Sequence, residues 1–406
     1  MTRMKIAFFV EYFPKISETF IMDQVVGLLR RGHDVHVFAL EDPSEEFHHE
    51  KVDEFDLTRR TTYLGRPANA IEGTLTAGRL ALHHPETLPE IVRSLERGVE
   101  GGGRIAALYQ FRSHIRSDWK FDIWHAHFGP IGKRWDFLPT LEDKPYVASF
   151  YGHDAASNVP ENRSTYTYLF DHADRITVLS EDMRDDLVSN GCPRDQTALQ
   201  PLPVDTERFS PAPEKSWRVG PTEVVTVARF VEKKGLDDAL EAIDAVSAEH
   251  DIRWRIAGDG LLRDKFESEV AKRDLTDVVK TLGLVSQTEI QRLLAEAHVF
   301  LLPSKRASSG DKEGTPTVLL EAQAAGVPVI STEHAGIPEI VRDRESGVLV
   351  PEGDPEALIQ ALEKFLSNPD RWEEMGQAGR ELVREKHSLQ AVARRLEEHY
   401  RAVINK

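Results

Sequence analysis

The sequence predicts an α/β protein built from two domains of similar size. Short apolar runs alternate with longer amphipathic segments along most of the chain, a pattern typical of βαβ units around a parallel sheet. A proline-rich stretch at 199–221 interrupts this pattern near the middle of the chain, and the pattern then restarts. The length of 406 residues is ample for two hydrophobic cores.

The first domain is expected over residues 1–205. Its strand candidates are rich in Val, Ile and aromatic residues, and they are Lys5–Val10, Val35–Leu40, Asp122–Ala126, Tyr146–Phe150 and Arg175–Leu179. Between the first two lies Glu18–Arg31, which carries one apolar stripe and stops at Gly32, as helices commonly do. These alternating elements predict a parallel sheet.

Residues 42–120 are expected to form a helical insertion in the first domain, with only Thr61–Leu64 similar to a strand. Gly101–Gly103 predicts a flexible turn. Apolar residues then recur at helical spacing over Arg104–Lys120, where four basic side chains and one acidic side chain give a local charge of +3. Two interpretations stay open: a surface helix packed on the domain, or a basic face resting on anionic lipid headgroups.

The second domain is expected over 206–385, followed by a helix at 386–406. Its strand candidates are Val224–Ala228, Arg253–Ala257, Val278–Leu282, Val299–Leu302, Pro328–Ser331 and Val348–Val350. The helical segments between them are Leu236–Ser247, Leu261–Arg273, Gln287–Ala297, Thr317–Ala325 and Glu356–Leu366.

Composition excludes several classes of protein. The chain has 51 basic and 68 acidic residues, a formal charge of −17, which argues against bulk nucleic-acid binding. Its one cysteine, Cys192, excludes a disulfide framework and a multi-cysteine zinc site, and we interpret it as a small residue in a turn. No apolar run reaches the roughly 18 residues of a membrane span, and the run at 6–10 is too short for a signal peptide. We therefore expect a cytoplasmic protein.

Motifs for dinucleotides, nucleoside triphosphates and metals are missing. The loop at 11–17 contains no glycine, and Gly258-Asp259-Gly260 has Arg263 where a third glycine would allow a pyrophosphate to approach. The sequence contains no Walker loop and no Asp-x-Asp pair. We expect a reaction without cofactor or metal ion.

Two cationic residues follow the first strand of the second domain. Arg229 and Lys234 come directly after Val224–Ala228, and the carboxyl ends of parallel strands form the functional crevice of such sheets. An arginine fork and a lysine point charge together can neutralise a diphosphate. The alternative is a solvated basic turn.

Two glutamates follow a later strand, Val299–Leu302. Glu313 lies in the loop and Glu321 within an otherwise apolar helical segment. A carboxylate accepts hydrogen bonds from vicinal hydroxyls, so Glu313 is a candidate for binding a sugar and Glu321 for binding a ribose. The amides of Thr317 and Val318 open the helix and offer an anion site.

These residues together resemble a known family. Arg229 and Lys234, the two glutamates, the run Glu321–Val329 and Gly336-Ile337-Pro338-Glu339 resemble the retaining GT-B glycosyltransferases of family 4, of the exopolysaccharide or colanic-acid type. The resemblance covers nearly all of the second domain. In the first domain it is looser and rests on the opening strand, loop and helix and on Tyr151-Gly152-His153-Asp154.

The resemblance implies two Rossmann-like domains facing each other across a cleft, with the final helix packed back on the first domain. The second domain would bind the nucleotide sugar and the first domain mostly the acceptor. By matching position, Arg229 and Lys234 would bind the diphosphate, Glu313 the donor sugar and Glu321 the ribose.

Further positions follow from the same resemblance. Thr315, Pro316, Thr317 and Val318 would contact the donor, Val285 would contact the base through its backbone, and His153 would contact the donor sugar near the reacting carbon. In the first domain, Ser17 and Glu18 replace the paired glycines of many relatives. Pro316 removes an amide that a glycine would offer, and Gln323 replaces a usual methionine.

His125 and His127 end a predicted strand. Two histidines without a third ligand make a weak metal site, so we interpret His127 as lining the cleft. The function implied by the family is transfer of a sugar, with retained configuration, from a UDP- or GDP-sugar to a hydroxyl of a saccharide or a lipid-linked saccharide. A basic helix would also allow peripheral contact with the inner face of the membrane. The alternatives are a nucleotide-sugar epimerase of similar fold and a non-catalytic two-lobed binding protein.

Overall fold

The computed structural model describes residues 2–15, 18–44, 49–65, 79–96, 99–114, 119–152, 154, 165–211 and 220–406. The chain forms two compact units. Unit 1 comprises Met1–Val178, Arg184–Gln200 and Ala393–Lys406, and unit 2 comprises Leu179–Met183 and Pro201–Val392. The chain therefore passes from one unit to the other at four points. The confirmed fold class is that of two parallel, Rossmann-like α/β sheets.

Unit 1 contains a seven-stranded parallel sheet in the order β3-β2-β1-β4-β5-β6-β7. Its strands are β1 (Lys5–Tyr12), β2 (Asp34–Glu41), β3 (Thr61–Tyr63), β4 (Ile123–His127), β5 (Tyr146–Ser149), β6 (Arg175–Val178) and β7 (Thr197–Leu199). Residues 6–10 of β1 are all buried, because helices cover both faces of a parallel sheet.

The helices that the structure describes in unit 1 are α1 (Thr19–Arg30), α2 (Lys51–Glu54), α4 (Leu88–Glu96), α5 (Val99–His114), α6 (Gly129–Arg134), α7 (Leu138–Glu142), α10 (Thr167–His172) and most of α11 (Glu181–Ser189) and α19 (Leu389–Ile404). Short 3₁₀ turns lie at Pro85–Thr87 and Arg194–Gln196.

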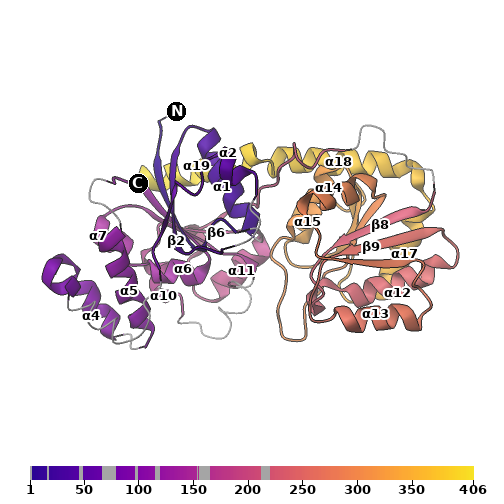
Figure 1. The fold of residues 1–406 in the computed structure, drawn as a ribbon, viewed down its shortest axis with the longest axis horizontal. Helices are drawn as coiled ribbons and strands as arrows, with labels where there is room; N and C mark the ends of the chain where they lie inside the picture. Colours follow the sequence, from indigo (N-terminus) through magenta and orange to yellow (C-terminus); the bar gives the residue numbers. More distant parts are fainter. Residues whose placement is uncertain are drawn as a thin grey trace. The chain divides into compact units, whose positions relative to one another are not determined.

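Unit 2 contains a six-stranded parallel sheet in the order β10-β9-β8-β11-β12-β13. Its strands are β8 (Thr222–Val227), β9 (Ile252–Ala257), β10 (Val279–Gly283), β11 (Val299–Leu302), β12 (Val329–Thr332) and β13 (Gly347–Val350). The helices are α12 (Leu236–Ser247), α13 (Arg263–Lys272), α14 (Gln287–Glu296), α15 (Thr317–Ala324), α16 (Ile337–Ile340), α17 (Pro355–Leu366) and α18 (Trp372–Lys386), with 3₁₀ turns at Glu232–Lys234 and Pro369–Arg371. Figure 1 shows α12, α13 and α17 on one face of this sheet and α14, α15 and α18 on the other.

Local sequence signals start several of these helices. The carboxylate of Asp354 accepts the amide of Ala357 at 3.0 Å, and Pro355 occupies the first position of α17, where a proline loses no hydrogen bond. The hydroxyl of Ser286 accepts the amide of Glu289 at 3.2 Å and caps α14 in the same way.

The last helix belongs to the core of unit 1. Leu396, Tyr400 and Val403 of α19 pack in the same buried cluster as β1, β2 and α1. The hydroxyl of Tyr400 lies 2.6 Å from Nδ1 of His125 on β4, and Arg31 donates to the carboxylate of Glu397 at 2.7 Å. Residues at the two ends of the sequence therefore complete one core.

The three consecutive glycines of the helical insertion differ from the sequence prediction. Gly101–Gly103 lies within α5 rather than in a flexible turn. Glycine costs about 1 kcal/mol relative to alanine in a helix, but Ile105, Leu108 and Phe111 of the same helix are at most 5% exposed. Tertiary packing of that apolar stripe outweighs the local propensity.

The basic helix is also more internal than a lipid-facing helix would be. Arg104 is 3% exposed, and its Nε lies 2.6 Å from the carboxylate of Asp136. Its Nη1 lies 3.3 Å from Glu90, and Arg112 pairs with Glu142 at 3.1 Å. The prediction that Arg104 belongs to an exposed basic face is therefore wrong, and the packed surface helix is the better interpretation. Residues 115–118 of this segment lie outside the described part of the chain.

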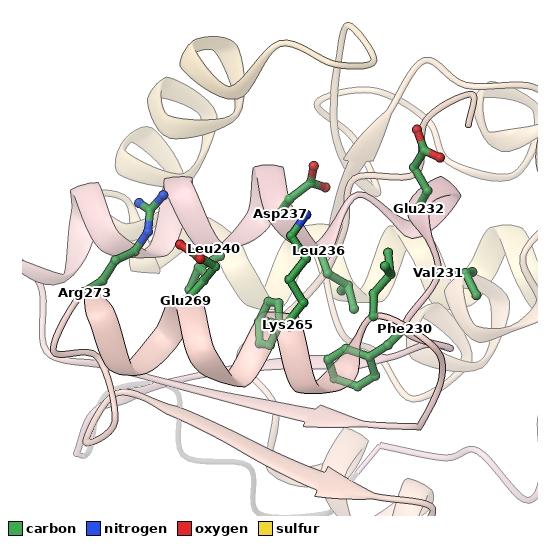
Figure 2. A pocket seen from close by; sticks show the side chains of 11 residues that line it. Phe230, Val231, Glu232, Leu236, Asp237, Leu240, Lys265, Glu269 and Arg273 are labelled. Atoms are coloured by element: carbon green, nitrogen blue, oxygen red, sulfur yellow. The ribbon is translucent and has the colours of Figure 1, made fainter. Parts of the chain in front are cut away.

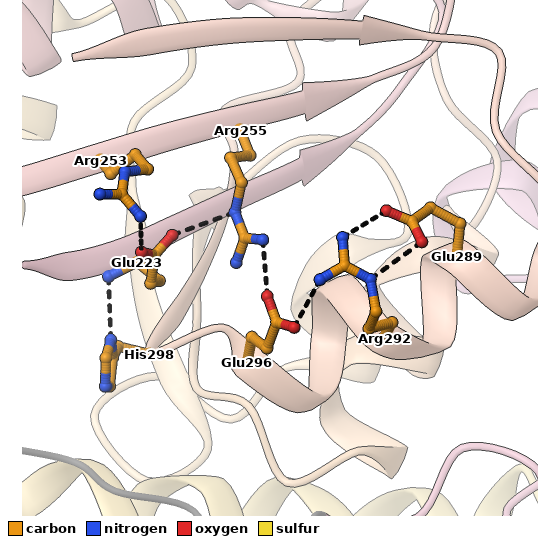
Figure 3. A network of polar contacts seen from close by, with 7 residues as sticks. All are labelled: Glu223, Arg253, Arg255, Glu289, Arg292, Glu296 and His298. Atoms are coloured by element: carbon orange, nitrogen blue, oxygen red, sulfur yellow. Dashed lines mark hydrogen bonds and ion pairs between the residues drawn. The ribbon is translucent and has the colours of Figure 1, made fainter. Parts of the chain in front are cut away.

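A network of ion pairs joins strands β8 and β9 to helix α14 in unit 2 (Figure 3). Glu223 on β8 pairs with Arg253 at 2.8 Å and with Arg255 at 3.0 Å, both on β9. Arg255 also pairs with Glu296 of α14 at 2.7 Å, and Arg292 links Glu296 to Glu289. His298 accepts the amide of Glu223 at 2.8 Å. This network lies toward the amino ends of β8 and β11.

Among the helices that the structure describes, none is both long enough and apolar enough to cross a membrane.

Candidate functional site

The predicted donor site lies at the topological switch point of the second sheet. The strand order reverses between β8 and β11, and crevices outside the carboxyl ends of strands at such points are where open α/β sheets bind ligands. Lys234 follows β8 and Glu313 follows β11. Their ammonium and carboxylate lie 3.0 Å apart, and the two side chains are 11% and 9% exposed. The structure therefore brings together two residues that the sequence places far apart.

The Glu313 carboxylate is ionised despite its burial. Burial alone would raise its pKa, but the charges of Lys234 and Lys233 and the hydrogen bond from Lys234 outweigh this effect and lower the pKa. Lys233 is held beside it, because its ammonium lies 3.1 Å from Asp311 and 3.2 Å from the carbonyl of Lys312. The result is a compact group of alternating charges.

A glycine allows the loops after β8 and β11 to meet. The turn Glu232–Lys234 ends at Gly235, whose φ is +63°, and α12 begins at the next residue. A Cβ at Gly235 would overlap the carbonyl oxygen of Pro303, which follows β11. Only glycine provides both the left-handed backbone and the space, and it thereby fixes Lys234 beside Glu313.

Arg229 lies at the exposed end of the same region, after β8. The loop that follows β9 packs against the residues on either side of Arg229. A Cβ at Gly258 would collide with the backbone of Ala228, and one at Gly260 with the backbone of Phe230. The Gly-x-Gly sequence thus serves close backbone packing of two loops.

The start of α15 presents the other predicted donor contacts. Thr317 and Val318 are half-exposed at its first turn, after Pro316 at the N-cap position. The hydroxyl of Thr315 is buried and has no hydrogen-bond partner among the described residues. Glu321 is half-buried in the second turn of the helix. Buried polar atoms normally have a partner, so the Thr315 hydroxyl is available to accept or donate a further hydrogen bond.

The remaining site residues of unit 2 have these positions. Val285 is half-exposed between β10 and the cap of α14. Gln323 is fully buried, and its amide donates to the carbonyl of Ile340 at 2.9 Å. This residue therefore has a packing role, which joins α15 to the end of α16.

The segment Gly336–Glu339, which follows β12 and begins α16, contacts the loop that carries Glu313. The amide of Gly336 donates to the carbonyl of Gly314 at 3.3 Å, and a Cβ at Gly336 would lie 2.8 Å from that oxygen. The carboxylate of Glu339 accepts the amide of Glu181 at 2.7 Å. Both contacts lie within unit 2, and they explain why the motif contains a glycine and a glutamate.

In unit 1, the predicted acceptor residues are only partly described. Ser17 and His153 lie outside the described residues. Glu18 precedes α1, and its carboxylate lies 2.6 Å from the ammonium of Lys15. Asp154 is 3% exposed and accepts the amides of Tyr151 at 2.7 Å and Gly129 at 2.6 Å. It thereby ties the loop after β5 to the start of α6.

His127 differs from the prediction of a cleft-lining side chain, because it is fully buried. Its Nδ1 lies 2.8 Å from the Tyr151 hydroxyl, and its ring packs 4.4 Å from the ring of Phe8. Burial lowers its pKa to about 3, so the imidazole is neutral. The interpretation as a cleft residue was wrong because aromatic residues cover this end of β4.

The described residues allow two further observations, on metal ligands and on the thiol. Within the described ranges, no three His, Cys, Asp or Glu side chains gather as metal ligands would. Cys192 is buried, and burial raises the pKa of its thiol to about 12. A thiol with so high a pKa is a poor nucleophile at neutral pH.

A cavity of about 380 Å³ lies beside α12 and α13 (Figure 2). Its lining includes the apolar side chains of Phe230, Leu236 and Leu240, with Lys265 and Glu269 among its charged residues. No residue of the predicted donor site lines it, and we therefore do not identify this cavity with the donor site.

Sequence reasoning missed two residues that support Glu313. His334 follows β12, and its Nε2 accepts the amide of Glu313 at 3.1 Å. Glu352 follows β13 and binds Nδ1 of the same ring. His334 stands two residues before Gly336-Ile337-Pro338-Glu339, and this proximity was the available signal.

Comparisons with known proteins agree with this architecture. The family model described as Glycosyltransferase Family 4 matches residues 17–208, and that described as Glycosyl transferases group 1 matches residues 211–382. The putative colanic acid biosynthesis glycosyltransferase WcaL of Escherichia coli (strain K12) is 34% identical over 97% of this chain and 98% of its own length. The amylovoran biosynthesis glycosyltransferase AmsK of Erwinia amylovora is 33% identical over 88% of this chain and 90% of its own.

Solved structures share the fold. The crystal structure of HepE from Anabaena in complex with UDP has a TM-score of 0.72 at 14% identity and covers 98% of this chain and 100% of that one. Both halves of the chain match family models, and the relatives match over nearly their whole length. The chain belongs to glycosyltransferase family 4, and it is a glycosyltransferase.

Proposed function

We propose that this glycosyltransferase transfers a hexose from a UDP- or GDP-sugar to a hydroxyl of a saccharide or lipid-linked saccharide, with retention of the anomeric configuration. The observation that carries the proposal is the Lys234–Glu313 pair of 3.0 Å at the switch point between β8 and β11. Unit 2 then binds the donor, and unit 1 provides most of the acceptor site. The UDP complex of HepE supports a nucleotide in a fold of this kind.

The charge of the departing diphosphate is the main demand on the site. We assign its stabilisation to Arg229, Lys234 and the amino end of α15. A preorganised positive charge or donor of this kind typically contributes about 10²–10³ in rate. Because these groups provide the charge, we propose that the reaction needs no metal ion.

The sugar is held by carboxylates in this proposal. Glu313 accepts hydrogen bonds from hydroxyls of the donor sugar, and Glu321 accepts them from the ribose. The free hydroxyl of Thr315 supports a ligand beside them. Val285 contacts the base, and His153 contacts the sugar near the reacting carbon.

Retention follows from attack on the face that the diphosphate leaves. The bond between the anomeric carbon and the phosphate oxygen breaks, and its electron pair goes to the diphosphate. The acceptor oxygen bonds to the same carbon on the same face, and its proton passes to a phosphate oxygen. Glu313 is paired with Lys234, which suits a carboxylate that binds rather than attacks.

Ligand-dependent thermal stability tests the donor site. Wild-type protein with EDTA is heated alone and with millimolar UDP, GDP, ADP and their sugars. A ligand that binds only the folded state raises the melting temperature. A response to one nucleotide class supports the proposal, and no response to any of them contradicts it.

A pair of arginine variants locates the binding. Arg229→Ala should abolish the stabilisation by the nucleotide. Arg273→Ala, whose side chain is 37% exposed and pairs with Asp244 at 2.8 Å, should leave it unchanged. An NMR spectrum of the first product formed then reports the anomeric configuration. An inverted configuration would contradict the retaining mechanism. Formation of an epimerised nucleotide sugar in the absence of acceptor would show that the protein is an epimerase and not a transferase.

A further inference from the structure

The backbone of Glu313 is held as firmly as its carboxylate. Its amide donates to Nε2 of His334 at 3.1 Å. His334 is 2% exposed and follows β12, whereas Glu313 follows β11. A second bond, from the Gly336 amide to the Gly314 carbonyl at 3.3 Å, joins the same two loops. The backbone of Glu313, whose carboxylate is predicted to bind the sugar, is therefore held in place by the segment that follows β12.

The hydrogen bonds define the tautomer of His334. An amide can only donate, so Nε2 must be the unprotonated acceptor, and the ring proton must be on Nδ1. Nδ1 faces the carboxylate of Glu352. The same carboxylate oxygen also accepts the amide of Arg306 at 3.2 Å. Glu352 thus favours the neutral tautomer with the proton on Nδ1, which is the only neutral tautomer whose Nε2 can accept the Glu313 amide.

We propose that His334 and Glu352 form a positioning pair that sets the Glu313 carboxylate for the donor sugar. This inference rests on the proposed function, because it gives Glu313 its role. The contacts run from Glu352 through His334 and Glu313 to Lys234. These residues follow β13, β12, β11 and β8, which are adjacent in the sheet. One chain of contacts therefore spans four neighbouring strand ends.

The electrostatic surroundings keep the ring neutral. Burial lowers the pKa of His334 and outweighs the opposing effects of Glu352 and Glu313, and Arg306 acts in the same direction as burial. A protonated ring would present an N–H toward the Glu313 amide and break the contact. The positioning pair therefore requires the neutral state.

The chain contains a matched control at the other end of the same sheet. His298 is 5% exposed, and its Nδ1 accepts the amide of a glutamate, Glu223, at 2.8 Å. It has the same chemistry and similar burial, but it lies at the amino end of β11 within the network of Figure 3. Loss of either histidine should cost similar stability, whereas only loss of His334 should disturb Glu313.

The experiment compares His334→Leu, His334→Gln and His298→Leu in the full chain, with kcat and donor KM measured beside the melting temperature. His334→Leu should lower kcat/KM by roughly 10–100-fold, the usual effect of losing a supporting contact to a functional ligand. His334→Gln keeps an acceptor where Nε2 lies and should recover most of that loss. His298→Leu should lower the melting temperature while kcat/KM stays within about twofold.

Two results would overturn the proposal. One is an equal change of kcat/KM in His334→Leu and His298→Leu. The other is an Nε2–H tautomer for His334 in the ¹⁵N spectrum of histidine-labelled wild-type protein, a measurement that needs no turnover. A wild-type protein that shows the Nδ1–H tautomer but neither binds nor uses any nucleotide sugar would contradict the proposed function instead, so the two failures are distinguishable.

Discussion

The ammonium of Lys234 lies 3.0 Å from the carboxylate of Glu313, and both side chains are largely buried. Neither charge would be stable there alone, because a buried ion without a partner loses its hydration. The pair therefore holds each residue in place before a ligand arrives. If the proposed donor site is correct, stability and donor binding depend on the same contact.

Removing one partner should be worse than removing both. Lys234→Met leaves the Glu313 carboxylate buried with less compensation, and it should destabilise the protein by about 3 kcal/mol. Lys234→Met combined with Glu313→Gln should recover part of this loss, although transfer remains abolished. Urea unfolding of Lys234→Met, Glu313→Gln and the double variant measures the coupling free energy between the two side chains. Strictly additive effects would show that the pair does not stabilise the fold.

The buried Arg104 of α5 should matter far more for stability than the partly exposed Arg112 of the same helix. Arg104→Met removes the cation that pairs with the buried carboxylate of Asp136 and leaves Glu90 with Arg93 alone, and a loss of about 3–5 kcal/mol is expected. Arg112→Met, in a pair with Glu142 nearer the surface, should cost about 1 kcal/mol or less. Urea unfolding measures both. Flotation with anionic vesicles should show no difference between wild type and Arg104→Met, and a clear loss of binding would restore the lipid-facing interpretation.

Alanine substitutions at two glycines should distinguish the cost of backbone strain from the cost of a steric clash. Both Gly235 and Gly310 have positive φ, at +63° and +86°. A Cβ at Gly310 meets nothing within 4 Å, whereas one at Gly235 collides with Pro303. Gly310→Ala should therefore cost only the strain of about 1–2 kcal/mol. Gly235→Ala should cost clearly more and also weaken nucleotide binding, because it displaces Lys234. Equal losses of unfolding free energy would contradict the close approach of the two loops.

The acid stability of unit 1 should depend on Glu397. Burial would raise the pKa of this carboxyl, but hydrogen bonds from Arg401 and Arg31, with His33 3.4 Å away, lower it from 4.5 to about 2. Because the folded pKa is the lower one, the stabilisation is complete above about pH 4.5 and is lost as the pH falls toward 2. Glu397→Gln should flatten the pH dependence of the unfolding free energy in that interval. The exposed Glu398 on the same helix provides the control, since Glu398→Gln should retain the wild-type slope.

Local patterns predicted most of the fold. The apolar run Val299–Leu302 is β11, and the amphipathic segment Leu236–Ser247 is α12, with the expected bounds. The short strand β7 (Thr197–Leu199) was missed, because it ends where the proline-rich stretch begins. Gly101–Gly103 was misinterpreted because glycine disfavours helices and the packing that compensates is tertiary.

The sequence located the candidate site residues at the ends of strands, but it did not predict the contacts between them. The positions of Lys234 and Glu313 followed from strand ends and family resemblance, whereas their pairing depends on the approach of two loops at Gly235. The role of His334 depends on Glu352, which follows a different strand. The inward direction of Arg104 depends on Asp136, which no charge pattern along one helix can show. Contacts between separate loops are the part that a single sequence leaves open.

The place of α19 in the core of unit 1 has a consequence for biosynthesis. Tyr400 and Leu396 are made after all of unit 2, yet they pack in one cluster with β1 and β4, which are made before it. The sheet of unit 1 therefore keeps an uncovered apolar face while all of unit 2 is translated. Chaperone capture during synthesis should concentrate on that face, and a stop codon before Ala393 should yield a chain with a folded unit 2 and an incomplete unit 1.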